Sequence, residues 1–406
     1  MRSIDMPELT FQLQGQTGDN HWHSILISVM RGLAALIVAA AHLRAEMYPG
    51  LRTIAEPPMW FQVFAFFTGF AHQAVLVFFV ISGWLVGGSL INKMGQPGAV
   101  RSYAIDRVTR LWTVLIPTFA LTLLLGIAAG VVHPGSIDFT PANEFSGVAF
   151  LGNLLGLQGI VLADFGGNYA LWSLANETWY YVMFPVLLLV FTARRIASRV
   201  ASAALLALAA ILLPVEIIIY FAIWLLGVAF SRVRIDCELW MRAVWLVPLV
   251  AASAYFRLTA NNDKFDQTTL GMDLLLSLMF LALLSSLQFN VAPTSIMAQP
   301  LMRVGTFFAN FSFSLYVLHL PMIFLFKHLA LTQLGLHQLA PNEPLHFALY
   351  LVMLICLLLG AYLSYLLFES QTYRIRRVVK RLVARRAVQP VAAPPTEAAA
   401  SIKRWH

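Results

Sequence analysis

Residues 345–368 read LHFALYLVMLICLLLGAYLSYLLF, an unbroken apolar stretch without Asp, Glu, Lys or Arg. A helix needs about 20 such residues to cross the hydrocarbon core of a bilayer. Similar runs recur along the chain, which is 59% hydrophobic and only 11% charged, whereas soluble domains carry about a quarter charged residues. The runs are too long for strands, and inside lipid only helices or closed barrels satisfy their own backbone. The sequence therefore predicts an all-α, polytopic membrane helical bundle.

The distribution of apolar and basic residues predicts about ten transmembrane helices and one further segment, 145–162. If 145–162 does not cross, both termini and most of the 27 Lys and Arg residues fall on the cytoplasmic side, as the positive-inside rule requires. We therefore interpret 145–162 as a re-entrant or surface-lying helix. The predicted spans are 24–44, 73–92, 111–132, 172–192, 199–213, 215–231, 239–257, 269–288, 304–326 and 345–368.

Three parts are expected along the chain: a cytoplasmic N-terminal segment (1–23), a membrane domain (24–370) and a cytoplasmic tail (371–406). The tail is first basic and then rich in Ala and Pro, a composition typical of disorder. Residues 1–23 lack the basic-then-apolar pattern of a signal peptide, so the first apolar run is expected to stay as a helix in the inner (plasma) membrane.

Charge and cysteine usage exclude other classes of protein. The net charge of +8 comes from basic residues between the apolar runs, so membrane orientation explains it better than nucleic-acid binding. Cys237 and Cys356 are the only cysteines and predict neither a disulfide framework nor a metal cluster.

The first predicted span contains two ionisable residues, Arg31 and His42. Eleven residues correspond to about 1100° of rotation, so both side chains share one helix face, about 16 Å apart along the axis. Ionisable groups inside a membrane are costly and usually functional. The alternative is an interfacial histidine and a snorkelling arginine. The topology places Arg31 nearer the cytoplasm and His42 nearer the outer side.

Arg107 and Arg110 precede the third span on the predicted cytoplasmic side. Their i, i+3 spacing puts both guanidinium groups on one helical face, where they could clamp phosphates. A plain positive-inside anchor is the alternative. In the second span, Ser82 could be a pore-lining hydroxyl, and Gly83 and Gly87 form a small-xxx-small face suited to close helix packing.

Glu177 is the only acid in the run Trp172-Ser-Leu-Ala-Asn-Glu-Thr-Trp-Tyr-Tyr181. We expect it at a depth similar to that of His42, where a carboxylate can fix the tautomer of an imidazole and raise its basicity. The alternative is an exposed acid at a helix start, stabilised by the helix dipole. His319 places a second imidazole in a later span; singly, a hydrogen-bonded core residue is its simpler interpretation. For Glu369, at the end of the last span, the simpler role is a cap or salt bridge.

Taken together, these segments resemble the acyltransferase 3 family of integral membrane acyltransferases. Their order and spacing match from residue 31 to about residue 370, and five motifs in order are specific although each alone is weak. The motifs that carry the resemblance are Arg31-x10-His42, Phe78-Phe79-x-x-Ser82-Gly83, Arg107-x-x-Arg110, Trp172-Ser173-Leu174-x-x-Glu177 and Ser314-Leu-Tyr316-x-x-His319-x-Pro321.

Three positions depart from the family pattern. Asn176 replaces a usual apolar residue, Thr178 stands where a second acid is common, and Glu369-Ser370-Gln371 replaces the usual Glu-x-Pro. No appended esterase-like domain is expected, as in the stand-alone members.

The resemblance implies transfer of an acyl group, usually acetyl, from cytoplasmic acyl-CoA to a hydroxyl of an extracytoplasmic or lipid-linked glycan, such as exopolysaccharide or lipopolysaccharide. Acetyl-CoA would serve as co-substrate, without a metal. His42, oriented by Glu177, would act as general base or take the acyl group itself. The implied residues are His42, Glu177 and Arg31 for catalysis, Arg107, Arg110 and Ser82 for the donor, and Trp172, Ser173, Tyr180, Tyr316 and His319 for substrate binding or support.

Two other classes of function compete with an enzyme. Buried Arg and His also mark transport pathways, so a transporter or flippase for a lipid-linked sugar is the main rival. Transporters often carry repeated halves with broken helices in matching positions, a pattern that the sequence lacks. A non-catalytic membrane scaffold would tolerate substitution of Arg31 and His42.

Overall fold

The computed structural model describes residues 7–12, 22–132, 140, 142–259, 265–288 and 298–388. Within them, seven helical stretches are long and apolar enough to cross a membrane, and three shorter apolar helices accompany these. The predicted all-α polytopic bundle is confirmed. The helices at the predicted spans are α1 (Trp22–Met47), α3 (Ala71–Ser82), α5 (Ala99–Ala128), α7 (Leu171–Thr192), α8 (Ile196–Leu212), α9 (Val215–Phe230), α10 (Leu239–Thr259), α11 (Leu270–Ser286), α13 (Ser312–Leu334) and α14 (Pro344–Leu367).

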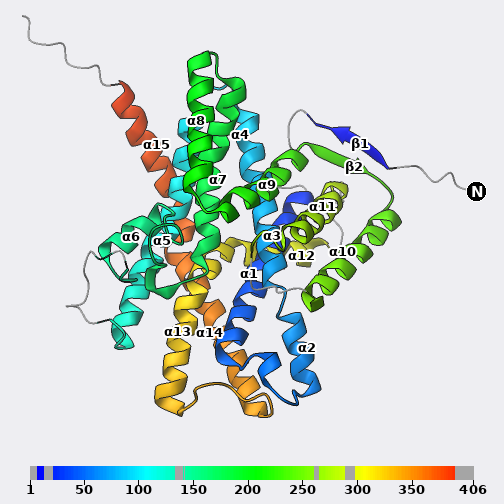
Figure 1. Cartoon of the computed structure of the whole chain (residues 1–406), viewed down its shortest axis with the longest axis vertical. Coiled ribbons are helices and arrows are strands. Elements are labelled where there is room, and N and C mark those ends of the chain that lie inside the picture. The colour runs from blue at the N-terminus through cyan, green and yellow to red at the C-terminus, as the bar shows by residue number, and fades with distance from the viewer. Residues whose placement is uncertain are drawn as a thin grey trace, which may run out of the picture.

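Shorter elements connect these helices. β1 (Glu8–Phe11) pairs antiparallel with β2 (Val233–Asp236), so part of the N-terminal segment lies against the connection between α9 and α10 (Figure 1). The remaining elements are the 3-10 helix Leu51–Thr53, α2 (Met59–Phe67), the π-helix Gly83–Gly87, α4 (Gly88–Lys93), α6 (Gly147–Leu154), the 3-10 helix Phe165–Gly167, α12 (Ala298–Asn310), the 3-10 helix Glu369–Gln371 and α15 (Thr372–Val388).

The bundle has two distinct ends. α2 and the connection between α13 and α14 lie at one end, called here the α2 end, and α15 and the turn between α7 and α8 lie at the other, the α15 end (Figure 1). Large apolar side chains on the outside of α10 are exposed, among them Val247 and Val250. An exposed apolar surface of this kind is expected where helices face lipid.

Glycines bring the second predicted span against α9. A Cβ atom on Gly83 would lie 2.0 Å from the carbonyl oxygen of Trp224, and one on Gly227 would lie 2.1 Å from that of Val80. Only hydrogen fits between backbones this close, so the predicted small-residue packing face is confirmed. The helix widens into its π-turn at this contact, a distortion that is frequent at functional sites.

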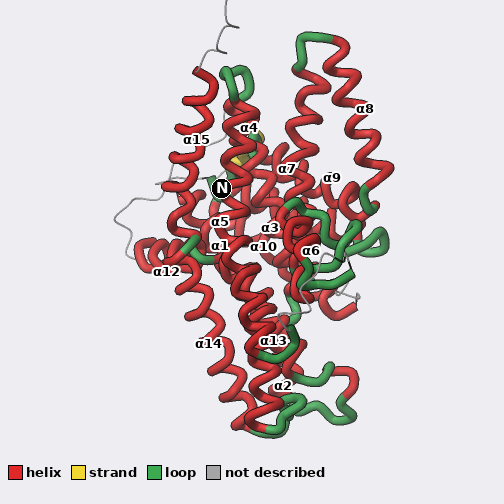
Figure 2. The backbone as a smooth tube through the Cα atoms, turned by 90° about the vertical axis from the view of Figure 1, so that its left-hand side faces the viewer, coloured by secondary structure: helices red, strands yellow, loops and turns green. Residues whose placement is uncertain are grey.

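The predicted span 304–326 is wrong as a single helix. The chain breaks at Phe311, the N-cap of α13, and the preceding residues form α12. α12 lies across α1 rather than along the bundle (Figure 2). Its Gly305 approaches Val29, where an added Cβ would lie 2.0 Å from a methyl carbon. The spanning helix is therefore α13, displaced by eight residues from the predicted start.

The segment 145–162 does not cross as a helix. α6 has 8 residues, about 12 Å of helix, and the rest is a folded loop. Asn153 organises this loop: its Nδ2 donates to the carbonyls of Ala149 and Ala163 at 2.8 and 2.9 Å, and its Oδ1 accepts from the Phe165 amide at 3.0 Å.

The basic half of the predicted tail is a docked helix, α15, and the expectation of disorder is wrong for this half. Lys380 and Arg376 on α15 contact Asp106 on α5 at 2.7 and 3.4 Å. Lys380 also donates to Ser102 at 2.9 Å. Asp106 thus holds two basic side chains of α15 against α5. The Ala- and Pro-rich half, from residue 389, lies outside the described residues.

Candidate active site

The residues predicted for the site line two cavities within the described part of the bundle. The arginine cavity, about 640 Å³, is lined by residues of α1, α3, α5, α7, α13 and α15. The histidine cavity, about 560 Å³, is lined by residues of α1, α3, α7, α9, α10 and α13 and of the loops that follow α2 and α6. Because α15 borders only the first and the residues after α2 only the second, the cavities lie toward opposite ends of the bundle.

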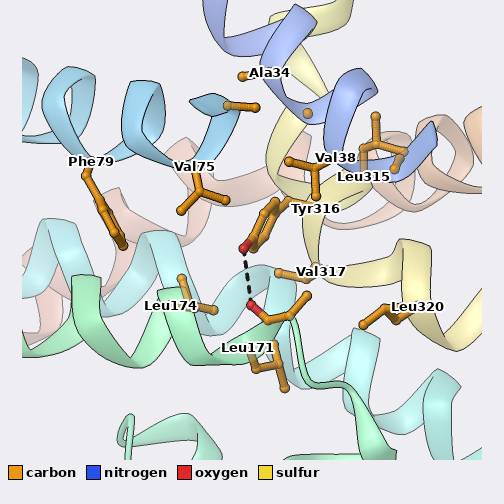
Figure 3. Close-up of a cluster of buried hydrophobic side chains, with 14 of the residues drawn as sticks. Ala34, Val38, Val75, Phe79, Leu171, Leu174, Leu315, Tyr316, Val317 and Leu320 are labelled. Carbon is orange, nitrogen blue, oxygen red and sulfur yellow. Dashed lines mark hydrogen bonds between the residues drawn. The ribbon is translucent and has the colours of Figure 1, made fainter. Parts of the chain in front are cut away.

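The cavities meet at Val75 and Tyr316, which line both. Figure 3 shows the Tyr316 ring between Val75 and Val38. The Tyr316 hydroxyl is hydrogen-bonded to Ser173 and donates to the Ala170 carbonyl at 3.2 Å. These bonds hold the ring at the junction between the two volumes.

The arginine cavity is rich in positive charge. Its charged lining consists of Arg31, Arg107, Arg110, Arg376, Glu177 and Glu369. Arg31 forms no ion pair within the described part of the chain, although Glu369 and Glu177 act on it electrostatically. Arg107 lies over the rings of Tyr103 and Tyr181, at 5.9 and 5.6 Å from their centroids. Its buried Nε has no hydrogen-bond partner among the described residues.

Arg110 is paired with a buried carboxylate. It forms an ion pair with Glu369 at 2.7 Å and lies over the Phe313 ring. Glu369 also accepts from the Ser314 amide at 3.0 Å and from its hydroxyl at 2.7 Å. The Ser314 amide belongs to the first turn of α13, so Glu369 caps that helix. The simpler interpretation of Glu369, as a cap and salt bridge, is therefore the observed one.

Glu177 lies in the arginine cavity and does not orient His42, so the predicted pairing is wrong. Its Oε1 accepts from Ser82 at 2.5 Å and from the Tyr181 hydroxyl. Trp172, which lines the histidine cavity, lies five residues earlier on α7. Five residues correspond to about 140° of net rotation and about 7.5 Å along the axis, so the two side chains serve different cavities.

His42 pairs instead with His319. Nδ1 of His42 lies 2.7 Å from Nε2 of His319, and Nδ1 of His319 lies 2.6 Å from the Tyr316 carbonyl. A carbonyl only accepts, so Nδ1 of His319 donates; in the neutral pair its Nε2 then accepts from Nδ1–H of His42. This leaves Nε2 of His42 with a free lone pair at the histidine cavity. The carboxylate that acts electrostatically on His42 is Glu46, one turn along α1.

A comparison with known protein families shows to which family this chain belongs. The family model Acyl_transf_3, described as an acyltransferase domain, matches residues 25–368. The chain belongs to the acyltransferase 3 family. The match begins before Arg31 and ends at Phe368, so it contains both histidines of the pair and the two arginines of α5, Arg107 and Arg110.

Comparison with individual proteins provides less information about this chain than the family match. An uncharacterized protein of Haemophilus influenzae is 32% identical over 120 residues, which cover 28% of this chain and 47% of the relative. The chain thus spans about half the length of that curated relative. No solved structure matches the chain.

The structure separates the predicted supporting residues of this acyltransferase-family chain. Ser173 and Tyr316 meet at the junction, Trp172 lines the histidine cavity, and Ser82 lines the arginine cavity. Tyr180 lines neither cavity; it is fully buried and packs on Phe79 and Trp224. Its role is therefore in the core.

The sequence analysis did not identify several residues that line the two cavities. Arg376 lines the arginine cavity from α15, and His72 lines the histidine cavity and contacts Asp273 at 2.7 Å. Asp273 is an acid inside an apolar span, the same signal that singled out Arg31. Within the described ranges, no group of three or more His, Cys, Asp or Glu side chains is arranged to hold a metal ion.

Proposed function

We propose that the protein transfers an acyl group, acetyl in the first instance, from cytoplasmic acyl-CoA to a hydroxyl of an extracytoplasmic or lipid-linked glycan. The supporting observation is the meeting of the two cavities at one tyrosine. One cavity offers arginines without carboxylate partners, and the other offers an imidazole nitrogen with a free lone pair.

The arginine cavity suits the phosphates of coenzyme A. Arg107 and Arg31 present positive charge that no ion pair neutralises among the described residues, and Arg376 adds a third guanidinium from α15. Guanidinium groups bind phosphate through charge-assisted, frequently bidentate hydrogen bonds. Arg110, held by Glu369, shapes the pocket wall. Glu177 belongs to this donor side, where it fixes the Tyr181 hydroxyl beneath Arg107.

The acyl group then has to reach His42. Arg31 and His42 are about 16 Å apart along α1, a distance that an extended pantetheine arm can bridge. The arm would pass Val75 and Tyr316. In this proposal the ring of Tyr316 turns aside when the arm enters, with exchange of its bond to Ser173.

At the histidine cavity, Nε2 of His42 takes the proton of the acceptor hydroxyl. The hydroxyl oxygen attacks the thioester carbonyl carbon, the new C–O bond forms and the C–S bond breaks. The proton on His42 then passes to the departing thiolate, which leaves as CoA–SH. His319 keeps Nδ1 of His42 protonated throughout, so that Nε2 remains the base. Such a base contributes about 10²–10⁴-fold to the rate.

The test uses the full-length protein, purified in lipid nanodiscs with acetyl-CoA. Slow release of free CoA, measured with a thiol reagent, is the expected result for the wild-type protein. His42→Ala should lower this release by about 10²-fold or more. His337, an exposed histidine between α13 and α14, provides the matched control, because His337→Ala should release CoA at the wild-type rate.

The acceptor is identified separately. Mass spectrometry of surface glycans from a deletion strain should lack an acetyl mass that the wild-type strain carries. The loss should be restored by the wild-type gene and not by the His42→Ala variant. A transporter or flippase would leave acetyl-CoA intact in nanodiscs, and this outcome would reject the enzyme.

A further inference from the structure

One face of α15 continues the lining of the arginine cavity toward the α15 end. Tyr373, Arg376 and Lys380 are spaced i, i+3 and i+7, so their side chains share this face. Tyr373 and Arg376 line the cavity, and Lys380 lies one turn beyond Arg376. The family match ends at Phe368, so this part of the wall comes from outside the segment that the family model covers.

A single carboxylate holds both cations against α5 and leaves hydrogen-bond donors on Arg376. Asp106 lies 3.4 Å from Nε of Arg376 and 2.7 Å from Nζ of Lys380. Lys380 also donates to Ser102 at 2.9 Å. Within the described residues, the Nη atoms of Arg376 form no hydrogen bond. The side chains of Arg376 and Lys380 are 26% and 37% exposed, so a ligand can reach both.

Positive charge exceeds negative charge at this place. Arg107 and Arg110 act electrostatically on Arg376, and Arg110 is already paired with Glu369. Among the described residues, Asp106 is the one acid in contact with Arg376. A phosphate monoester carries a charge of about −1.5 to −2 at pH 7 and forms charge-assisted hydrogen bonds with guanidinium groups. The excess of cations is therefore suited to a phosphate monoester.

The order of the groups along coenzyme A matches the order of residues along the cavities. The thioester has to reach His42, which places the pantetheine arm at the junction and the pyrophosphate near Arg31 and Arg107. The ribose with its 3′-phosphate then lies outermost, beside α15. The Tyr373 ring is 64% exposed and carries Arg377 at 4.6 Å from its centroid. An exposed aromatic ring offers a stacking surface to a nucleotide base.

We propose that Arg376 and Lys380 bind the 3′-phosphate of the acyl-CoA donor, so that the protein distinguishes CoA from dephospho-CoA. This inference rests on the proposed function and names the part of the donor that α15 recognises. Asp106 acts as a positioning residue, because it holds both cations at the cavity while no donor is bound.

The test compares two donors in the same protein, so that a general loss of activity cancels. Full-length protein in phosphatidylcholine nanodiscs is assayed for thiol release from acetyl-CoA and from acetyl-dephospho-CoA, and the ratio of the two kcat/KM values is taken. Calorimetric titration with CoA and dephospho-CoA gives the corresponding ratio of Kd values without turnover. The variant is Arg376→Ala/Lys380→Ala. Its matched control, Arg374→Ala/Arg381→Ala, removes two exposed arginines of α15 that line neither cavity.

The wild-type protein should prefer the donor with the 3′-phosphate by about tenfold or more, because dephospho-CoA forfeits the charge-assisted hydrogen bonds. In Arg376→Ala/Lys380→Ala this preference should fall to about twofold or less, and in the control it should stay at the wild-type value. A wild-type protein without preference would overturn the inference. An equal fall in the control would do the same, since it would assign the effect to the overall charge of α15.

A further variant separates phosphate binding from support of the helix. Asp106→Asn keeps an oxygen that accepts from both cations but removes the charge that competes with the phosphate, so the preference should rise above that of the wild type. A fall to the level of Arg376→Ala/Lys380→Ala would show that the cations only hold α15, against the inference. A wild-type protein that binds CoA with the expected preference but releases no CoA from acetyl-CoA would reject the proposed function and support the phosphate site.

Discussion

At the residue scale, the histidine pair shows how much chemistry depends on one hydrogen bond. His42 was predicted from its position on one helix face with Arg31, but its partner could not be. His319 lies 277 residues away in the chain, and only the packing of α13 against α1 brings it close. The same limitation explains Glu177. Hydropathy locates a span, but it does not tell which cavity each turn of that span faces.

The pairing predicts different effects for two substitutions of His319. His319→Leu removes the acceptor for Nδ1–H of His42, so the free lone pair is no longer confined to Nε2; CoA release should fall by about 10²-fold or more. His319→Gln keeps an acceptor oxygen and should retain more activity than the Leu variant. Steady-state kinetics should assign the loss to kcat with little change of the acetyl-CoA KM. Equal activity of both variants would contradict the tautomer argument.

The two arginines of α5, Arg107 and Arg110, should also behave differently. Arg107 has no carboxylate partner among the described residues, so Arg107→Ala should raise the KM for acetyl-CoA about tenfold and leave thermal stability nearly unchanged. Arg110→Ala leaves the buried Glu369 carboxylate without its charged partner and should lower the free energy of unfolding by about 1.5–3 kcal/mol. Thermal melts in nanodiscs, followed by intrinsic fluorescence, distinguish the two. A larger stability loss for Arg107→Ala would contradict this division of roles.

At the element scale, periodicity and composition predicted most helices within a few residues, because a span needs a minimum apolar length. They failed where a tertiary contact decides the structure. The break at Phe311 follows from the cap that Glu369 provides to α13, and the order in α15 follows from its ion pairs to Asp106. Neither partner is adjacent in sequence, so neither outcome could be predicted from a local window.

The close contact between the π-helix and α9 gives an element-scale prediction. Gly83→Ala would place a methyl group 2.0 Å from the Trp224 carbonyl oxygen, and overpacking of this kind lowers stability by about 1–3 kcal/mol. Gly271 on α11 is the matched control, because an added Cβ there meets nothing within 4 Å and Ala favours a helix over Gly. Thermal melts should show a decrease for Gly83→Ala and no decrease for Gly271→Ala. Equal melting temperatures would refute the packing argument.

At the scale of the whole molecule, the proposed reaction needs the two cavities to open toward opposite sides of the membrane. The positive-inside rule predicts that the α15 end faces the cytoplasm. A single cysteine at position 337, in a variant without Cys237 and Cys356, should therefore react with an impermeant maleimide in intact cells. A single cysteine at position 195, at the turn between α7 and α8, should react only after the membrane is opened. Reversed labelling would place the donor cavity on the wrong side for acyl-CoA.

The cap at Glu369 joins the two ends of this chemistry mechanically. α13 carries Tyr316 and His319 within two turns of its capped start, so one helix positions both the residue at the junction and the residue that is hydrogen-bonded to His42. The start of this helix is held by Glu369, which also forms the ion pair with Arg110. A phosphate that draws Arg110 away from Glu369 would loosen the start of this helix and tilt both side chains together. Binding of the acyl donor would then change the positions of Tyr316 and His319 at the same time.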